Sequence, residues 1–239
     1  MRINFDFTAA PGAHFGPKQT IDELLAEIPN PIDFWEARPE NLTITDGKVS
    51  AWTGKLGRQF VQANAARRPT YTADGLRMGN AAGDGPEAFL SLAGAQIGPA
   101  PALAIATRIR LPPAALTQDL HYLWAGSVPI LRLTYRYTNS NNYLRANILG
   151  AANSLDVDLP AGQETIGAVL VADGPAVSLH LPGGATASFA AAGDADFANL
   201  FIGSGTGAAA ALNGWQQRFG MWRHVPDAEQ LATLLKWVG

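Results

Sequence analysis

The chain reads Ile130-Leu-Arg-Leu-Thr-Tyr-Arg-Tyr137 and, after a short polar stretch, Tyr143-Leu-Arg-Ala-Asn-Ile148. Apolar and polar residues alternate along both segments, and a period of two is typical of a β-strand with one buried and one exposed face. The stretch between them, Asn139 to Asn142, is rich in turn-forming residues. The two segments therefore predict an antiparallel β-hairpin.

The register of this hairpin assigns each side chain to a face. If Asn139 to Asn142 form the loop, Thr138 lies opposite Tyr143, and Arg136 lies opposite Arg145. One face is then the core face, with Leu133, Tyr135, Tyr137, Leu144, Ala146 and Ile148. The other is polar, with Arg132, Thr134, Arg136, Tyr143, Arg145 and Asn147. Two arginines directly opposite each other destabilise a strand pair, so we expect a compensating anion from the chain or from a ligand, or else solvation of both charges.

Short segments separated by turn signals continue on both sides of the hairpin. Turns are indicated at Asp46-Gly47, Asp74-Gly75, Asp84-Gly85-Pro86, Asp173-Gly174 and Pro182-Gly183-Gly184. Many short strands at such intervals are typical of a sandwich or barrel rather than of alternating β and α units. We expect an all-β fold, a two-sheet antiparallel jelly-roll sandwich over residues 31–239.

Helical patterns are confined to the two ends of the chain. Thr20-Ile21-Asp22-Glu23 forms a capping-box pattern that opens a short helix over residues 21–28, and Pro29 ends it. Pro226-Asp227-Ala228-Glu229 begins a second helix that runs to Trp237. Residues 1–30 are expected to form an arm that docks the sandwich onto a neighbouring protein or, as an equal alternative, wraps around the sandwich.

Composition excludes several classes of function. The formal net charge is only −3 at pH 7, so no bulk attraction to nucleic acid or to anionic membranes is expected. The chain has no Cys, which excludes disulfides and thiolate metal sites. No stretch approaches the roughly 18–20 apolar residues that span a bilayer. The first residues lack a signal-peptide pattern, so we expect synthesis in a cytoplasm.

Several short motifs occur along the chain in an order that is typical of one family of domains. They are Phe34-Trp35-Glu36-Ala37, Asp46-Gly47-Lys48-Val49-Ser50-Ala51-Trp52, Arg68-Pro69-Thr70-Tyr71, Leu200-Phe201-Ile202-Gly203, Asn213-Gly214-Trp215 and Val225-Pro226-Asp227. Together they resemble the opening and closing patterns of concanavalin A-like lectin/glucanase domains of the laminin-G-like kind. The resemblance covers residues 31–239 and implies a jelly roll that binds carbohydrate, although a fold alone does not supply a function.

The chain departs from this family at the positions that would carry catalysis. Enzymes of the family hydrolyse glucans with two Glu residues spaced Glu-x-Asp-x-Glu, one as nucleophile and one as general acid/base. The nearest match, Glu36-Ala37-Arg38-Pro39-Glu40, has Arg in place of Asp, contains Pro, and precedes the expected catalytic strand. The family's Trp-x-Asp-x-Ser-Gly loop is also matched only in part, because residues 52–57 keep its Trp and Gly but lack its Asp and Ser. We therefore expect no enzymatic activity.

The best candidate for sugar binding is the polar face of the hairpin. Sugar-binding proteins set an aromatic ring beside planar polar groups, because a pyranose has an apolar face and a hydroxylated rim. Trp124 follows a Pro-rich connection and is expected to reach the surface, whereas the other five tryptophans are expected in the core. The predicted ligand-binding residues, forming a groove for an acidic or hydroxyl-rich polysaccharide, are Arg132, Arg136, Tyr143, Arg145, Asn147 and Trp124.

No metal or cofactor site is indicated strongly. The four histidines lack metal-ligand spacing, and His180 is expected on the polar face of a strand, solvated or locally hydrogen-bonded. Asp156-Val157-Asp158 and Asp194-Ala195-Asp196 offer oxygens to Ca²⁺, but such residues are common at turns and strand ends. We expect no cofactor, with Ca²⁺ as an open alternative.

The resemblance implies a non-catalytic carbohydrate-binding module. Jelly rolls of this kind resemble adhesins of phage virions, including fibres, spikes and gene transfer agents, which leave the host by lysis. The expected partners are a cell-surface polysaccharide, further copies of the chain in a homo-oligomer, and other particle proteins held through residues 1–30. A purely structural decoration or spike subunit is the first alternative, and a polysaccharide hydrolase the second.

Overall fold

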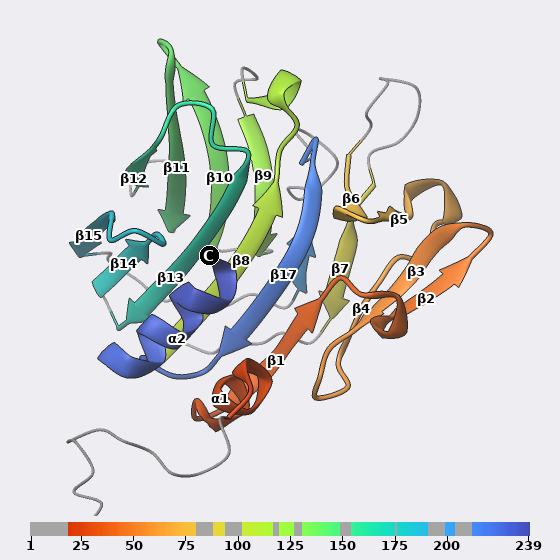
Figure 1. The fold of residues 1–239 in the computed structure, drawn as a ribbon, viewed down its shortest axis with the longest axis horizontal. Coiled ribbons are helices and arrows are strands. Elements are labelled where there is room, and N and C mark those ends of the chain that lie inside the picture. The colour runs from red at the N-terminus through yellow and green to blue at the C-terminus, as the bar shows by residue number, and fades with distance from the viewer. Residues whose placement is uncertain are drawn as a thin grey trace, which may run out of the picture.

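The computed structural model of the 239-residue chain describes residues 19–79, 88–93, 102–116, 120–126, 131–148, 154–174, 176–190, 199–203 and 212–239. Two antiparallel sheets face each other, and two helices lie on the outer side of one of them (Figure 1). The expected all-β sandwich with a short helix at each end is confirmed.

Sheet A carries the helices. Its strands follow the order β15-β14-β13-β8-β17-β6-β5, and β1 also pairs with β17. Their bounds are β1 Pro31–Glu36, β5 Thr70–Thr72, β6 Gly75–Arg77, β8 Ala102–Arg110, β13 Thr165–Asp173, β14 Ala176–His180, β15 Thr186–Ala190 and β17 Trp215–Trp222. β1 and β6 share one edge of β17, because β6 pairs with residues 215–216 and β1 with residues 218–222.

Sheet B follows the order β12-β11-β10-β9-β16-β7-β4-β3-β2. Its strands are β2 Leu42–Thr45, β3 Lys48–Thr53, β4 Gln59–Val61, β7 Leu90–Ala93, β9 Leu120–Gly126, β10 Leu131–Thr138, β11 Asn141–Ile148, β12 Ser154–Leu159 and β16 Asn199–Ile202. Three 3₁₀ turns complete the described chain: η1 Pro39–Asn41, η2 Ala65–Arg67 and η3 Pro113–Ala115. Expected turns occur at Asp46-Gly47 and Gly183-Gly184, where positive φ angles need residues that tolerate them.

The main core lies between the two sheets. It is dominated by aliphatic side chains with a cluster of aromatic rings, in which Phe60 contacts Trp35 edge-on with ring centroids 4.7 Å apart and Phe219 at 5.6 Å. Tyr135 is fully buried here, and its hydroxyl donates a hydrogen bond to the carbonyl oxygen of Leu116 at 2.8 Å. Burial raises the pKa of Tyr135 to about 12, so this hydroxyl stays protonated as a donor.

A second core forms outside sheet A, beneath the helices α1 Ile21–Glu27 and α2 Ala228–Val238. Trp237 of α2 packs edge-on against Trp222 of β17 and Phe34 of β1, at centroid distances of 6.2 and 6.3 Å. The helix comes so close to β13 that a Cβ at Gly167 would lie 2.2 Å from the carbonyl oxygen of Val238. Glycine at this position therefore sets the distance between α2 and the sheet.

The short N-terminal helix belongs to this second core. The expected capping box of Thr20 and Glu23 is present, and α1 begins and ends within one residue of the expected bounds. Trp222 donates its indole Nε1–H to the carbonyl oxygen of Leu25 at 3.1 Å, and Lys55 pairs with Asp22 at 2.9 Å. Residues 19–30 thus wrap around the chain's own sandwich. Residues 1–18 of the expected docking arm lie outside the described residues.

The hairpin differs from the expected register by two residues. The loop consists of Asn139 and Ser140 alone, both with positive φ (52° and 66°), as in the two-residue turns that match the twist of paired strands. Arg136 therefore lies opposite Tyr143, and Thr134 opposite Arg145. A shift of two keeps every side chain on its expected face, because the strand period is also two. The expectation of two arginines directly opposite each other was wrong.

The loop that departs from the family pattern folds around a buried carboxylate. Asp33 of β1 is fully buried and accepts backbone N–H hydrogen bonds from Phe34, Leu56 and Arg58 at 2.7 to 2.9 Å. Burial raises the pKa of Asp33, whereas these three hydrogen bonds act in the opposite direction. A Cβ at Gly54 would lie 2.3 Å from this carboxyl group, so the loop closes only with glycine there.

Candidate functional site

Strands β10, β11 and β12 arrange polar side chains in a regular grid on the outer face of sheet B. The register gives three rows: Arg132, Asn147 and Ser154; Thr134, Arg145 and Asp156; Arg136, Tyr143 and Asp158. Neighbouring strands in a sheet are about 4.8 Å apart, so side chains within a row are in reach of one another. We call these nine residues the outer-face grid, and Arg145 occupies its centre.

Arg145 is held by a bidentate ion pair. Its Nε and Nη2 donate to Oδ1 and Oδ2 of Asp156 at 2.7 and 2.6 Å, and its guanidinium carbon lies 5.4 Å from the centre of the Tyr143 ring. The hydrogen bonds to Asp156 are the main cause that raises the pKa of Arg145. Of the alternatives for the expected anion, the structure supports the carboxylate of the chain itself.

The floor of the grid is buried and its long side chains are partly exposed. Thr134 and Asn147 are buried. Thr134 donates its hydroxyl to the carbonyl oxygen of Arg145 at 3.2 Å, and Asn147 accepts from Nε of Arg132 at 3.2 Å. Nε of Arg136 is buried and has no hydrogen-bond partner among the described residues. A buried guanidinium nitrogen of this kind calls for a water or a ligand oxygen.

Five of the six predicted site residues share the outer-face grid, and one does not. Arg132, Arg136, Tyr143, Arg145 and Asn147 lie on it. Trp124 of β9 is fully buried in the core between the sheets. It pairs with Leu133, a core-face residue of β10, so its side chain points inward. The expectation that Trp124 reaches the surface was wrong.

Sequence reasoning missed two acidic members of this face. Asp156 and Asp158 belong to β12, whose side chains alternate between exposed and buried along Ser154–Leu159. The alternation Leu155, Val157, Leu159 with the two Asp residues between them was a readable strand signal. β12 is the next strand after β11 along the chain, and consecutive strands usually pair with each other. The alternation and this rule together were therefore the signal that could have placed both Asp residues beside β11.

An aromatic pair continues the outer face beyond the grid. Phe201 of β16 lies opposite Ala125, which in turn lies opposite Arg132 of the grid. Phe89 packs edge-on against Phe201 with ring centroids 6.0 Å apart, and the guanidinium of Arg67 lies 5.8 Å above the Phe89 ring. Apolar rings and arginine side chains thus occur together along one face of sheet B.

The described residues contain no cluster of three or more His, Cys, Asp or Glu that could hold a metal ion. Of the residues considered for Ca²⁺, Asp156 is committed to Arg145, and Asp194 and Asp196 lie outside the described residues. His180 lies on β14 with its Nε2 2.7 Å from the hydroxyl of Ser178, so the expected local hydrogen bond is confirmed. None of the described helices is both long and apolar enough to cross a membrane.

The fold is shared with solved structures at low sequence identity. A Trypanosoma rangeli sialidase in complex with sialic acid superposes with a TM-score of 0.56 and 15% identity, covering 90% of this chain and 36% of the sialidase. Domain 4 of a GH43 extracellular arabinanase from Geobacillus stearothermophilus, in complex with arabinotriose, gives a TM-score of 0.59 and 13% identity over 89% of this chain and 100% of that domain. The binding domain of botulinum neurotoxin serotype D gives 0.56 and 10%, over 87% and 52%.

These similarities are to β-sandwiches in proteins that bind or process carbohydrates or carry a binding domain. The chain spans little more than a third of the length of the sialidase structures that it matches. No protein-family model matches the sequence, and a search of curated proteins finds no match.

Proposed function

We propose that this chain is a non-catalytic carbohydrate-binding module whose ligand lies on the outer-face grid. The observation that carries the proposal is the arrangement of Tyr143, Arg145 and Asp156. A partly exposed aromatic ring lies beside a guanidinium and a carboxylate that hold each other in a fixed geometry.

This arrangement suits the two kinds of surface on a sugar. The Tyr143 ring offers an apolar platform for the C–H face of a pyranose or furanose. The Arg145–Asp156 pair offers donors and acceptors at fixed positions for neighbouring hydroxyl groups, and little side-chain entropy is lost when such preorganised groups bind. The pair of Phe89 and Phe201 extends the apolar surface across the sheet, which suits a chain of several sugars.

We assign a hydroxyl-rich rather than an acidic glycan to this face. Arg145 is already neutralised by Asp156, and Asp158 adds a second negative charge beside Tyr143. An acidic sugar would have to compete with Asp156 for the guanidinium, whereas a neutral sugar can use both partners at once. Arg136 at the edge of the grid adds a further donor.

The absence of a catalytic role is part of the proposal. A glycosidase of the retaining or inverting kind needs two carboxyl groups on either side of the scissile bond. Glu36, the first carboxylate of the nearest sequence match, is buried and paired with Arg38 and Arg218 at 2.8 and 3.2 Å. Glu36 is therefore engaged inside the protein by two guanidinium groups and does not lie free beside a groove.

The proposed setting is the surface of a virion or phage-like particle, where the module would bind a host polysaccharide. This step rests on the family resemblance of the sequence. A decoration subunit that binds no sugar is the alternative, and it predicts that a neighbouring chain covers the outer-face grid. Mass spectrometry of purified particles, with antibody labelling of the chain on them, tests the setting separately from the binding.

Binding is best tested by isothermal titration calorimetry of the full chain against a panel of neutral and acidic polysaccharides. Tyr143→Ala should weaken binding about tenfold or more, since loss of a stacked ring removes roughly 1–3 kcal/mol. Arg58→Ala, an exposed arginine outside the grid, should leave the affinity within about twofold. No binding across the panel would contradict the proposal and favour the structural subunit.

Asp156→Asn separates the two classes of glycan. If a neutral sugar uses Arg145 and Asp156 together, the variant should bind it more weakly. If the ligand is acidic, the variant should bind it more tightly, because the guanidinium loses its internal competitor. The second outcome would overturn the assignment of a hydroxyl-rich ligand while keeping the site.

A further inference from the structure

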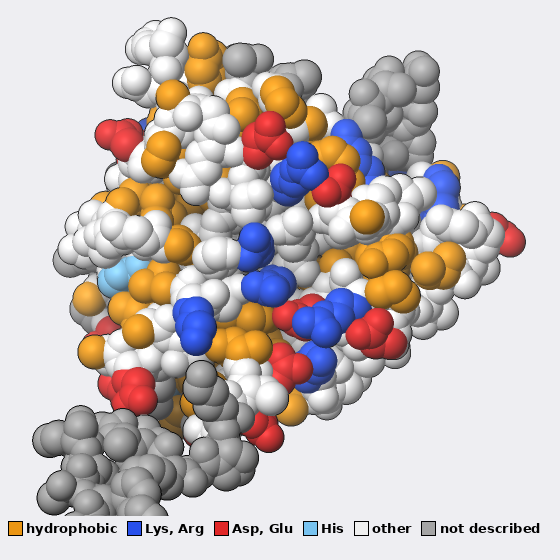
Figure 2. Space-filling view, viewed as in Figure 1, with side chains coloured by type: hydrophobic (Ala, Val, Ile, Leu, Met, Phe, Trp, Pro, Cys, Tyr) orange, Lys and Arg blue, Asp and Glu red, His pale blue; other side chains and the backbone are white. Residues whose placement is uncertain are grey.

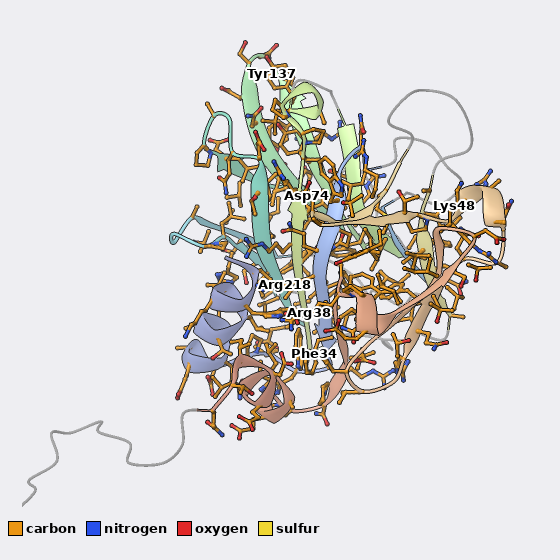
Figure 3. The ribbon with its side chains drawn as sticks, turned by 45° about the vertical axis from the view of Figure 1, so that its right-hand side comes forward. Phe34, Arg38, Lys48, Asp74, Tyr137 and Arg218 are labelled. Carbon is orange, nitrogen blue, oxygen red and sulfur yellow. The ribbon has the colours of Figure 1, made fainter. Side chains whose placement is uncertain are left out.

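A cavity of about 240 Å³ lies on the other side of the molecule, on the outer face of sheet A. It opens where β1 and β6 meet along the same edge of β17, beside the end of α2. Its lining is formed by Glu36, Ala37, Arg38, Ala73, Asp74, Gly75, Arg108, Gln217 and Arg218. Figure 3 shows Asp74, Arg218 and Arg38 one after another down the middle of the molecule, and Figure 2 shows a band of basic and acidic side chains there.

Two arginines of this cavity are direct neighbours. Arg108 of β8 lies opposite Arg218 of β17 in the register, and like charges in this relation repel each other. Burial and the charge of Arg218 together lower the pKa of Arg108. Arg38, which is 55% exposed, adds a third guanidinium at the mouth of the cavity.

Internal partners use only part of this donor set. Arg218 contacts Glu36 with Nε at 3.2 Å and the carbonyl oxygen of Trp237 with Nη1. Arg108 donates Nε to Gln217 at 2.9 Å and Nη1 to a main-chain oxygen of Gly239. Nη2 of Arg108 and Nη2 of Arg218 have no hydrogen-bond partner among the described residues. Neither nitrogen is buried, so both remain accessible to a ligand.

The carboxylates in the lining are already engaged. Glu36 is buried between Arg38 and Arg218 and also accepts the indole N–H of Trp237 at 3.3 Å. Asp74 at the rim is paired with Arg110 from outside the cavity, and Gln217 holds its carbonyl oxygen at 3.0 Å. Three guanidinium groups therefore face the cavity with one buried carboxylate among them.

We propose that this cavity binds a carboxylate group of a small organic acid or of an acidic sugar residue, held by Arg38, Arg108 and Arg218. Glu36 shows the chemistry that the cluster accepts, since its carboxylate already lies between two of these guanidinium groups. Planar guanidinium forks pair with carboxylates in two-pronged fashion. The volume is below the roughly 300–1,000 Å³ of sites for larger ligands, so it suits one acidic residue rather than an oligosaccharide.

The cavity is independent of the proposed function, because the outer-face grid belongs to the other sheet. The two ligands also differ in charge. The grid neutralises its central arginine internally, whereas this cavity keeps excess positive charge.

The test compares galacturonic acid with galactose, which has the same ring without the carboxylate, in calorimetric titrations of the full chain. Both titrations are made on Tyr143→Ala, because the grid of the parent chain is proposed to bind neutral sugars. In this variant galacturonate should bind and galactose should not. Arg38→Gln should weaken galacturonate binding about tenfold, the loss expected for a charge-assisted hydrogen bond. The matched control Arg58→Gln removes the same charge from outside the cavity and should change the affinity less than twofold.

Two further variants serve as controls. The first tests whether the fork of Arg108 itself is needed while the fold is kept, and the second tests whether galacturonate binds at the grid instead of the cavity. Arg108→Lys keeps the charge but loses the fork, so it should also weaken binding while circular dichroism reports whether α2 stays folded. Tyr143→Ala should leave galacturonate binding unchanged. Equal behaviour of galactose and galacturonate, or unchanged affinity in Arg38→Gln, would overturn the proposal. Tighter binding of inorganic phosphate than of galacturonate would overturn the assignment of a carboxylate.

Discussion

The outer faces of the two sheets differ in what covers them. On sheet A, β13 is buried along almost its whole length, because α1 and α2 close over the face that points away from the sandwich core. On sheet B, β12 alternates between exposed and buried positions, and the grid beside it carries arginine, aspartate and tyrosine. A strand that is apolar on both faces thus marks the sheet that helices cover, and an alternating strand marks the sheet with an accessible face.

The same kind of ion pair has different consequences on the two faces. Arg145 and Asp156 on sheet B have side chains that are 28% and 40% exposed. Glu36 on sheet A has a side chain that is only 3% exposed and is shared by Arg38 and Arg218. An exposed pair costs little to break and is free to meet a ligand. A buried carboxylate needs its partners for stability.

The largest expected effect on the free energy of unfolding comes from weakening the packing of α2 against sheet A. Trp237→Ala should lower the free energy of unfolding by about 3–5 kcal/mol, because it removes a fully buried ring that packs on Trp222 and Phe34. Urea denaturation followed by tryptophan fluorescence measures it. The matched change on the uncovered face, Tyr143→Ala, should cost less than about 1 kcal/mol. Similar costs for the two variants would contradict the contrast between the faces.

Gly167→Ala should be the next most damaging change. Its Cβ would meet the carbonyl oxygen of Val238, a backbone atom that moves only if the end of α2 moves. Overpacking of this kind costs about 1–3 kcal/mol, and the melting temperature should fall accordingly. A variant as stable as the parent would show that α2 can shift without losing its contacts with the sheet.

Double-mutant cycles sharpen the comparison of the two ion pairs. The coupling energy of Arg145 with Asp156 should be about 0.2–1 kcal/mol, as for other exposed pairs. The coupling of Arg218 with Glu36 should be larger, because loss of Arg218 leaves a buried carboxylate with one partner fewer. Chemical denaturation of each set of four proteins gives both numbers. The reverse order would contradict the assignment of the buried pair to stability.

The smallest expected effect is a change in the pH dependence of stability, through His180 on β14 of sheet A. Burial lowers the pKa of His180 from 6.5, so the unfolded chain binds the proton more readily than the folded chain. This contribution to stability is present above pH 6.5 and is lost as the pH falls through the folded pKa. His180→Gln should therefore show a flatter dependence of the melting temperature on pH below 6.5. An unchanged slope would mean that other groups cause it.

Local sequence patterns determined much of this protein. The alternation around Leu133 and Leu144 determined the faces of the hairpin, because neighbouring residues of a strand point to opposite sides. Capping residues such as Thr20 and Asp227 determined where both helices begin. These signals act over a few residues, so they are readable without the fold. The hairpin register was missed because Asn139 and Ser140 alone make the turn, and a tetrapeptide rich in turn formers does not reveal which two residues adopt positive φ.

Only the tertiary structure decided which distant segments meet. It set the register in which Asp156 of β12 meets Arg145 of β11, the strand before it, and this carboxylate is one of the compensating groups that the sequence had left open. It turned Trp124 inward through its pairing with Leu133. It also gathered Arg38, Arg108 and Arg218 around one cavity, although they come from three separate parts of the chain. Contacts of this kind depend on the order of strands in a sheet, which is set by burial of the whole core rather than by any local pattern.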